Sequence, residues 1–384
     1  MKKLDLVVVG GGILGASHAF AALKKGLTVT LLEKDLYPIE STVRNFGQVV
    51  PSGMKRGEWF EYGRKGLSHY AEIQSKYDIG LRNNGSIYIA STPDEMAVNE
   101  ELYSYYQSID YPCQLLTKEE VLAKYPSLKT SYVLGAIFFP AEYSAESEVL
   151  IHNIHKYLSL SFPDTYNYLT SHTVIDVNTK EGECITTTSN KQTFVSEQVI
   201  VCSGRDFKAL FPLEFENSGL VVSKLNMFST KPMPEVKLDG NILTGLTIRR
   251  YESFEECKAY QHLDKSLVNP EHVKYGIHIL FKQRKDGSII MGDSHEYAPY
   301  NEADSLGFYV NNYITDLMFK EAKNIINLPN WEVALHWAGF YAQCKNADIF
   351  HKTIDNKIHI ITGIGGKGMT TSMGYAHNTI NNLF

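Results

Sequence analysis

The N-terminal pattern of hydrophobic and polar positions predicts a strand, a glycine turn, a helix and a second strand. Leu4–Val9 is an unbroken apolar run of the kind found in buried parallel strands. Small and apolar residues follow at helical spacing over Ile13–Lys25, Gly26 ends this segment, and Leu27–Leu32 forms the next apolar run. Because two such strands joined by a helix make one βαβ unit, we expect them to lie parallel in one sheet.

Three later apolar runs predict further buried strands, at Ile87–Ala90, Gln198–Cys202 and Ile358–Thr362. Glu146–Leu160 has a helical pattern, whereas residues 215–335 alternate short apolar pieces with polar turns, as in an antiparallel sheet. We therefore predict an α/β (α+β) fold, in which a Rossmann-like domain with a parallel sheet is interrupted by a mostly antiparallel substrate domain. The predicted nucleotide-binding domain takes residues 1–85, 145–215 and 335–384, and the substrate domain takes residues 86–144 and 216–334.

The first turn carries a dinucleotide-binding motif. Gly10, Gly12 and Gly15 have the spacing G-x-G-x-x-G, and Glu33 ends the next strand. The first glycine permits the tight turn, the second lets the backbone approach a pyrophosphate, and the third brings helix and strand close together. The helix start offers N–H groups to the phosphates. We expect Glu33 to accept hydrogen bonds from the ribose hydroxyls.

A second glycine turn precedes a predicted C-terminal helix at Ser372–Asn382. The segment Gly363–Met369 follows the strand Ile358–Thr362, so it is a second candidate anion site at a helix start. Reduction of a flavin places negative charge at the N1–C2=O edge of its ring. Lys367 or the N–H groups of this turn could stabilise that charge, so the second turn favours a flavin over a nicotinamide.

Together these segments resemble the D-amino-acid oxidase superfamily of FAD enzymes, which includes glycine oxidase and sarcosine oxidase. The resemblance rests on the first glycine motif with Glu33, the loop Ser41–Gln48, the segment Val199–Gly204 and the turn Gly363–Met369. It implies non-covalent FAD, since the cysteine that carries the flavin in sarcosine oxidases aligns with Gly339 here. The cofactor-binding residues implied by the motifs and the resemblance are Gly10, Gly12, Ile13, Leu14, Gly15, Glu33, Lys34, Ser41, Thr42, Arg44, Asn45, Gly47, Val174, Ser203, Gly204, Gly363, Gly365, Gly366, Lys367, Gly368 and Met369.

A closer resemblance is to an FAD oxidoreductase subfamily associated with phosphonate breakdown. It rests on the runs RNFGQVVPSG, GDSHEY and TGIGGKGMT, and it implies an aminophosphonate or an N-methylated aminophosphonate as substrate. In glycine oxidase and D-amino-acid oxidase, an arginine in a WAGLRP segment holds the substrate carboxylate. The matching stretch here is Trp337–Ala342, with Tyr341 at the arginine position. This departure argues against a simple α-amino acid as substrate.

Five side chains are candidates for substrate binding and catalysis: Lys367, Arg44, His278, His336 and Tyr341. Arg44 lies in the loop expected to touch the flavin, and its fork-shaped guanidinium suits a phosphonate or a carboxylate, although an ion pair at a domain boundary is an equal alternative. Lys367 occupies a glycine turn, where a lysine has no obvious packing role. His278 lies in the alternating segment Tyr275–Phe281, where a packed, hydrogen-bonded histidine is the alternative to a substrate role.

Two further pairs of residues have both a functional and a structural interpretation. Arg249 and Arg250 lie in the predicted substrate sheet, where strand alternation points one inward and one outward. A solvated pair is the alternative. Asp293 and His295, in the run GDSHE, could shape the pocket or form a turn.

The implied reaction is oxidation of the C–N bond of a small amine or amino acid by hydride transfer to flavin N5, with oxygen or a quinone as electron acceptor. No side-chain base is obligatory for it, so the protein supplies orientation, exclusion of water and electrostatic tuning. Two alternatives remain open: an FAD-dependent dehydrogenase of a hydroxy acid or polyol phosphate, and a non-catalytic nucleotide-binding module.

Composition narrows the class of protein further. A length of 384 residues suits two domains, and a net charge of -6 argues against a nucleic-acid partner. The five cysteines are odd in number and lack C-x-x-C spacing, so we expect no metal site, no disulfide framework and a reducing compartment. Gly10–Gly12 interrupt the N-terminal apolar run, and no other stretch approaches the roughly 20 apolar residues of a membrane span. We expect a cytoplasmic protein without a transmembrane segment.

Overall fold

The computed structural model describes residues 3–384 and begins with the predicted strand, turn and helix. The strand β1 (Leu4–Val9) is followed by the helix α1 (Ile13–Lys24) and the strand β2 (Val29–Leu32), which is parallel to β1. Gly10 turns the chain with φ +101°, and a Cβ at Gly15 would lie 1.9 Å from the carbonyl oxygen of Gly10. The glycines are therefore required for the close packing of helix against strand.

The first sheet has a parallel centre, as the sequence predicts. Its parallel strands lie in the order β20 (Ile358–Thr362), β12 (Thr193–Val201), β1, β2 and β9 (Tyr166–Leu169). Three antiparallel strands extend it: β11 (Glu183–Thr188) pairs with β12, β10 (Val174–Lys180) pairs with β11, and β19 (Phe350–Ile354) pairs with β20. The carboxyl ends of β1, β12 and β20 therefore meet at one edge, where nucleotide sites of α/β sheets lie.

The second sheet is mostly antiparallel. Its strands lie in the order β17 (Glu296–Pro299), β13 (Leu220–Thr230), β16 (Ile289–Gly292), β15 (Leu280–Gln283), β14 (Asn241–Leu243), β5 (Ser86–Ala90), β7 (Gly135–Phe139) and β6 (Gln114–Thr117), and β18 (Val333–Cys344) also pairs with β13. A small third sheet consists of β3 (Gln48–Val49), β8 (Tyr143–Ala145) and β4 (Leu81–Asn83). The predicted α/β fold class is confirmed.

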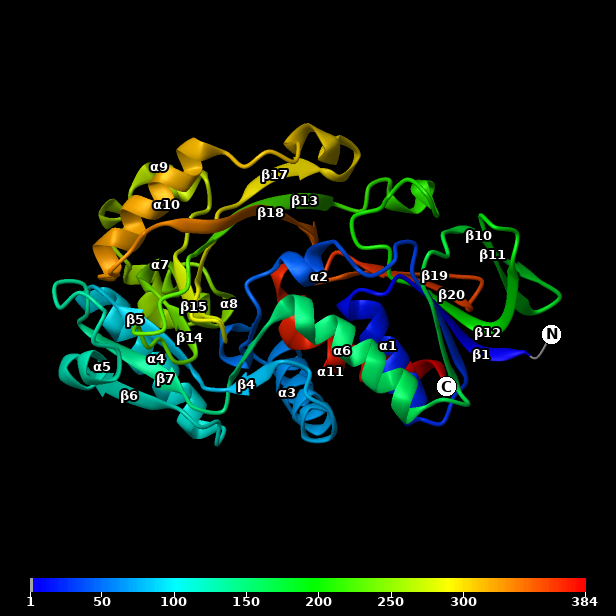
Figure 1. Ribbon diagram of the computed structural model, residues 1–384, viewed down its shortest axis with the longest axis horizontal. Helices are drawn as coiled ribbons and strands as arrows, with labels where there is room; N and C mark the ends of the chain where they lie inside the picture. Colours follow the sequence, from blue (N-terminus) through cyan, green and yellow to red (C-terminus); the bar gives the residue numbers. More distant parts are fainter. Residues whose placement is uncertain (1–2) are drawn as a thin grey trace.

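Helices cover one face of the parallel sheet and lie between the two large sheets in Figure 1. The helix α1 packs against α6 (Ser147–Ser161) and α11 (Gly368–Leu383), and α11 packs against α3 (Glu58–Lys76). A Cβ at Gly374 of α11 would lie 2.2 Å from the carbonyl oxygen of Tyr62 in α3, so the two helices approach closely. The other α-helices of the described chain outside residues 215–335 are α2 (Ser41–Arg44), α4 (Pro93–Ser108) and α5 (Lys118–Lys124).

The middle of the chain differs from the expectation of strands and turns alone. It contains the helices α7 (Gly245–Ile248), α8 (Glu252–Glu255), α9 (Pro270–Lys274) and α10 (Asn312–Ile325). Asn311 caps α10 by accepting hydrogen bonds from two backbone N–H groups, and the buried face of α10 includes Ile314, Leu317 and Met318. The helical spacing of its apolar residues was not recognised, because the surrounding region was interpreted as short strands alternating with polar turns.

Two segments differ from what the sequence suggested, one in its secondary structure and one in the sheet to which it belongs. The predicted strand Tyr275–Phe281 was wrong over most of its length, because regular pairing begins only at Leu280. The chain from residue 335 onward was assigned to the nucleotide domain, but β18 pairs along its length with β13 of the second sheet. The long strand β18 thus carries residues from the substrate sheet toward the C-terminal glycine turn.

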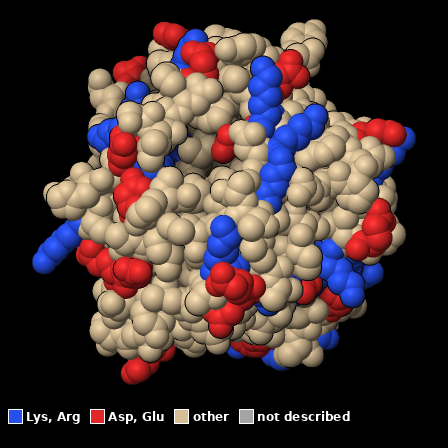
Figure 2. Space-filling view, turned by 90° about the vertical axis from the view of Figure 1, so that its left-hand side faces the viewer, with Lys and Arg blue, Asp and Glu red and all other residues tan. Residues whose placement is uncertain are grey.

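The surface mixes both signs of charge. On the face shown in Figure 2, acidic and basic side chains alternate around a hollow. Within residues 3–384, no helix combines the length and the apolar character that a bilayer crossing requires.

Candidate active site

A cavity of about 580 Å³ connects the start of α1 with the second sheet and the C-terminal turn. Its walls come from the first glycine turn, the loop after α2, the segments around β15 and β16, the end of β18 and the turn before α11. Those elements lie at the carboxyl edge of the parallel sheet, so the topology brings distant parts of the sequence to one place.

Most of the predicted cofactor residues line this cavity. They are Gly12, Ile13, Leu14, Gly15, Ser41, Thr42, Asn45, Gly47, Gly204, Gly363, Gly365, Gly366, Lys367, Gly368 and Met369. Of the predicted catalytic residues, Lys367, His278 and Tyr341 line it too. The lining does not include Gly10, Glu33, Lys34, Arg44, Val174, Ser203 or His336.

The start of α1 is held by a hydroxyl from the next loop. The N–H of Ile13 donates to Thr42 Oγ1 over 3.0 Å, and a Cβ at Gly12 would lie 3.2 Å from the same oxygen. Because this hydroxyl accepts from the backbone, its own proton remains free to be donated to an anion in the cavity. Thr42 thus accepts a hydrogen bond at the start of α1 and can donate one to a group in the cavity.

Glu33 is buried and already bonded to the backbone. Its carboxylate accepts hydrogen bonds from the N–H groups of Gly11, at 2.7 Å, and Asp35, at 3.0 Å. Each carboxylate oxygen has a further lone pair, so capacity for ribose hydroxyls remains. Lys34 instead forms an exposed ion pair with Asp206, and Val174 is buried where β10 pairs with β11.

The loop after α2 is fixed by its own side chains. Asn45 donates to the carbonyl oxygens of Ser41 and Thr42 and accepts from the N–H of Gly47. The hydroxyl of Ser41 donates to the carbonyl oxygen of Phe340 over 2.6 Å, so it ties the loop to β18 rather than facing the cavity freely. The buried ammonium of Lys282 donates to the carbonyl oxygens of Phe46 and Gly47 and of Ala145 in β8, although burial lowers the pKa of Lys282 to about 7.

Two of the predicted catalytic residues point away from the cavity. The guanidinium of Arg44 donates to the carbonyl oxygens of Ile39 and Ala338, so it joins α2 to β18. The imidazole of His336 lies 3.0 Å from the hydroxyl of Thr315 in α10. Both residues therefore have structural contacts, and the anion-binding role considered for Arg44 has no support in this geometry.

The ammonium of Lys367 is neutralised by two carboxylates. It contacts Asp348 at 2.5 Å and Glu252 at 3.3 Å, and it lies 4.7 Å from the centre of the Trp59 ring. The expectation that this lysine has no packing role was wrong. The turn itself is confirmed as a glycine turn, with φ +75° at Gly363 and +64° at Gly365, followed by the helix α11.

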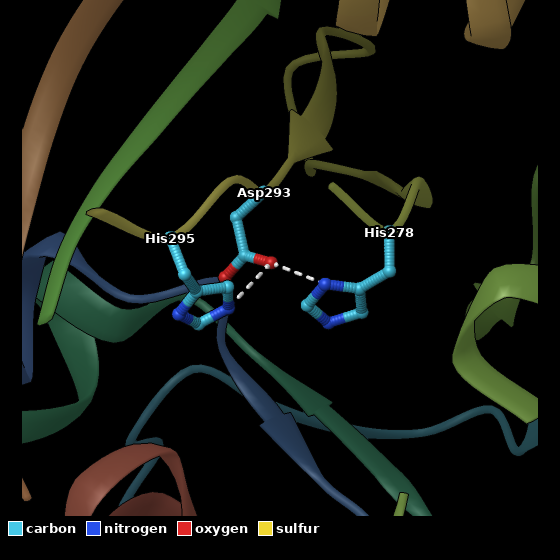
Figure 3. Close-up of side chains that lie close together, drawn as sticks. All are labelled: His278, Asp293 and His295. Atoms are coloured by element: carbon cyan, nitrogen blue, oxygen red, sulfur yellow. Dashed lines mark ion pairs between the residues drawn. The ribbon is translucent and has the colours of Figure 1, made fainter. Parts of the chain in front are cut away.

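Three polar side chains meet in the wall of the cavity formed by the second sheet (Figure 3). The Nδ1 atom of His278 lies 3.0 Å from Oδ1 of Asp293, and Nε2 of His295 lies 3.5 Å from the same oxygen. Burial lowers the pKa of His278 to about 3, so this imidazole is neutral at neutral pH. Burial alone would raise the pKa of Asp293, but the two facing imidazoles keep it below its ordinary value. The sequence named all three residues, yet it did not place them together.

The two adjacent arginines have different environments. Arg249 is not on a strand: it follows α7, and its side chain pairs with Asp94 at 3.2 Å and Glu95 at 2.6 Å. Arg250 lines the cavity, donates to Tyr297 Oη over 3.0 Å, and has no carboxylate partner within residues 3–384. Arg250 is therefore the arginine available to an anion in this cavity.

Aromatic hydroxyls complete the wall. Tyr341 is buried, and burial holds its pKa well above the ordinary value, so it is a neutral phenol. Tyr251 accepts a hydrogen bond from Nε2 of Gln48 over 2.6 Å, and both residues line the cavity. No local pattern in the sequence links this pair, because Gln48 and Tyr251 are 203 positions apart.

The arrangement fits an elongated nucleotide cofactor. Glycine at position 10 lets the end of β1 approach the cavity residue Cys202, because a Cβ there would lie 2.3 Å from the carbonyl oxygen of Cys202. The buried hydroxyl of Ser203, between the lining residues Cys202 and Gly204, has no hydrogen-bond partner in the described chain. A glycine turn with a helix start at each end of one cavity suits a pyrophosphate at α1 and a ring at α11.

Comparison with known proteins agrees with this geometry. The family model "FAD dependent oxidoreductase" matches residues 5–381. Glycine oxidase of Geobacillus kaustophilus is 25% identical over 53% of this chain and 55% of its own length. Its crystal structure superposes with a TM-score of 0.76 at 16% identity, covering 100% of this chain and 95% of that one. The aligned sequence thus spans about half of that relative, whereas the fold matches nearly throughout.

Two other similar proteins have names that refer to glycerol phosphates. Glycerol 3-phosphate dehydrogenase of Caloramator mitchellensis is 23% identical over 96% of this chain and 71% of its own length. L-α-glycerophosphate oxidase of Mycoplasma pneumoniae, solved with FAD bound, has a TM-score of 0.75 at 15% identity and covers 100% of this chain and 95% of that one.

Proposed function

Because the chain belongs to the family of FAD-dependent oxidoreductases, we propose that it oxidises the C–N bond of a small amine that carries an anionic group. The candidate substrates are aminophosphonates, N-methylated aminophosphonates and related amino acids. Bound FAD would supply the acceptor for a hydride leaving the carbon next to nitrogen.

One observation carries the proposal: a single cavity joins the two glycine turns to a wall with one arginine that has no carboxylate partner within residues 3–384. Arg250 provides a charged fork for a phosphonate or carboxylate, and no lysine or arginine stands at position 341 to take that role. Tyr341 and Tyr251 provide hydroxyls and ring faces beside it. The substrate anion would therefore be held from the 250–251 side of the cavity rather than from β18.

The cavity wall supplies positioning and shielding rather than an obligatory base. Ile13, Leu280 and Met369 contribute apolar surface to the lining, and the neighbouring loop is locked by Asn45 and Lys282. Fixed walls of this kind hold a substrate carbon against a ring and keep water out. The five cysteines are free and buried, which supports the cytoplasmic location expected from the sequence.

A second candidate is a dehydrogenase or oxidase of a polyol phosphate. The similarity to the Caloramator mitchellensis protein over 96% of this chain favours it, and a phosphate would meet Arg250 as well as a phosphonate would. The two candidates differ in the atom beside the oxidised carbon, which is nitrogen in one and oxygen in the other.

Anaerobic reduction of the bound flavin separates them. Loss of absorbance near 450 nm would be followed with aminophosphonates, their N-methyl forms, D-amino acids, glycerol 3-phosphate and hydroxy acids. Bleaching by amines alone supports the proposal, and bleaching by glycerol 3-phosphate or a hydroxy acid alone replaces it with the second candidate. A protein that takes up no flavin contradicts both.

The arginine is tested with a matched pair of variants. In Arg250→Met, we expect the KM for an anionic amine to rise by roughly 10- to 100-fold, since a hydrogen bond to a charged group contributes about 1.5–3 kcal/mol. The same change at Arg44, which lies outside the cavity, should leave the KM within about threefold. Equal effects of the two variants on KM would contradict the assignment of the anion to Arg250.

A further inference from the structure

His278, Asp293 and His295 lie close together, but their facing polar atoms are not satisfied by hydrogen bonds. The atoms His278 Nδ1, Asp293 Oδ1 and His295 Nε2 are all buried, and none has a hydrogen-bond partner in the part of the chain that the structure describes. The 3.0 Å separation between His278 Nδ1 and Asp293 Oδ1 lacks hydrogen-bond geometry. Buried polar atoms without partners are costly, so three of them in one place suit an ion bound between them.

The two separations that involve Asp293 match the edges of a metal coordination shell. Bonds of roughly 2.1 Å from a divalent transition metal to nitrogen and oxygen place neighbouring ligands roughly 3.0 Å apart in an octahedral shell and 3.4 Å apart in a tetrahedral one. Oδ1 of Asp293 lies 3.0 Å and 3.5 Å from the two ring nitrogens, and the three ligand atoms lie within 4.8 Å of one another. Little movement is therefore needed to hold an ion between them.

The surroundings hold the three ligands in place. The other ring nitrogen of His295 lies 2.9 Å from the hydroxyl of Ser223, which is buried on β13. Metal-binding histidines ordinarily have such a partner, because it orients the ring. The backbone groups of His278 and Asp293 bond to each other in both directions, at 3.1 Å and 2.9 Å, so these two side chains project from paired positions.

We propose that His278, Asp293 and His295 bind a divalent transition metal of the zinc class in the cavity wall. Two imidazoles and one carboxylate are a donor set suited to Zn²⁺, Fe²⁺ or Co²⁺. All three residues line the cavity, so the open coordination position faces its interior. The carboxylate offsets one charge of the ion and Arg250 adds another positive charge nearby, so an anionic oxygen of a substrate, or a hydroxide, is the fitting remaining ligand.

Metal binding by the purified flavoprotein tests this site without reference to substrate. The protein is prepared without a histidine tag, dialysed against a chelator, and titrated with Zn²⁺ in competition with a chromogenic chelator. We expect one tight site per chain. In Asp293→Asn and in His278→Ala the affinity should fall by at least about 10–100-fold, since even outer partners of metal ligands have effects of that size.

A matched control separates the cluster from chance binding by surface histidines. His262 is exposed, and His262→Ala should bind Zn²⁺ like the unchanged protein. Flavin content reports that each variant is folded, and His295→Ala replaces any variant that loses its flavin. When Co²⁺ is bound to the unchanged protein, its paramagnetic spectrum should show that nitrogen atoms coordinate the ion. The proposal is overturned if no stoichiometric Zn²⁺ binds, or if folded cluster variants bind it as tightly as the unchanged protein.

Discussion

At position 47 the backbone leaves no room for a side chain. Gly47 has φ +79°, and a Cβ there would lie 2.2 Å from the carbonyl oxygen of Ala145 and 2.4 Å from Nζ of Lys282. Gly47→Ala should lower the free energy of unfolding by at least about 3 kcal/mol, because left-handed strain and overpacking add together. Urea unfolding and the flavin content of the purified protein measure the effect.

Gly182 provides the control for backbone strain alone. It has φ +81° in the turn between β10 and β11, and a Cβ there would have nothing within 4 Å. Gly182→Ala should therefore lower the free energy of unfolding by only about 1–2 kcal/mol and leave the flavin content unchanged. Equal losses in the two variants would show that the contacts of Gly47 with Ala145 and Lys282 have no energetic role.

Glu142 should make stability depend on pH. Burial raises the pKa of this carboxyl from 4.5 to about 7, although Ser52 and Tyr111 donate hydrogen bonds to it. The folded protein then keeps the proton over a pH range in which the unfolded chain has lost it. The contribution of the protonated Glu142 carboxyl to the free energy of unfolding is complete below pH 4.5 and is lost as the pH rises through about 7.

The corresponding variant is Glu142→Gln, which keeps the shape and the acceptor oxygen but does not titrate. Relative to this variant, the unchanged protein should lose about 1–3 kcal/mol of unfolding free energy between pH 4.5 and pH 8, since each pKa unit corresponds to about 1.4 kcal/mol. Urea unfolding at several pH values provides the measurement. Parallel pH profiles of the two proteins would mean that the folded carboxyl titrates normally.

At the scale of elements, the turn before α11 combines one cation with two anions. Lys367 lies between Asp348 and Glu252, and all three residues line the cavity. If the flavin ring lies at this turn, its midpoint potential should respond to both signs of charge. Lys367→Met should lower the potential and Asp348→Asn should raise it, each by about 30 mV or more, which for two electrons is about 1.4 kcal/mol. Equilibration with redox dyes measures this, and shifts of the same sign would place the ring elsewhere.

Elements with local patterns could be predicted from sequence, and elements defined by distant partners could not. The strands β1, β12 and β20 and the glycine turns could be predicted from their own residues. A buried parallel strand requires a continuous apolar run, and a turn at positive φ favours glycine. The run Val333–Cys344 could not be assigned to its sheet, since its partner β13 lies about a hundred positions earlier. The short helices of residues 245–274 were missed because each is stabilised by caps and tertiary contacts rather than by a long period.

The same distinction applies to the site. Most residues of the two glycine motifs line the cavity, although Gly10 does not, whereas the roles suggested for Arg44 and His336 depended on side-chain direction, which sequence does not reveal. Arg249 and Arg250 are adjacent, yet one is paired with carboxylates and the other faces the cavity, because α7 replaces the strand expected there. Side-chain direction at a helix end is set by packing rather than by alternation.

For the whole molecule, the cavity couples the two large sheets, because its lining comes from both. A cofactor that spans it binds the folded chain and not the unfolded one, so it should stabilise both sheets together. The free energy of unfolding should rise with free FAD, by about 2.7 kcal/mol at a concentration of 100 times the dissociation constant. Urea unfolding followed by circular dichroism at several FAD concentrations measures this rise. If the midpoint did not move with FAD, the cavity would not be the site that joins cofactor binding to folding.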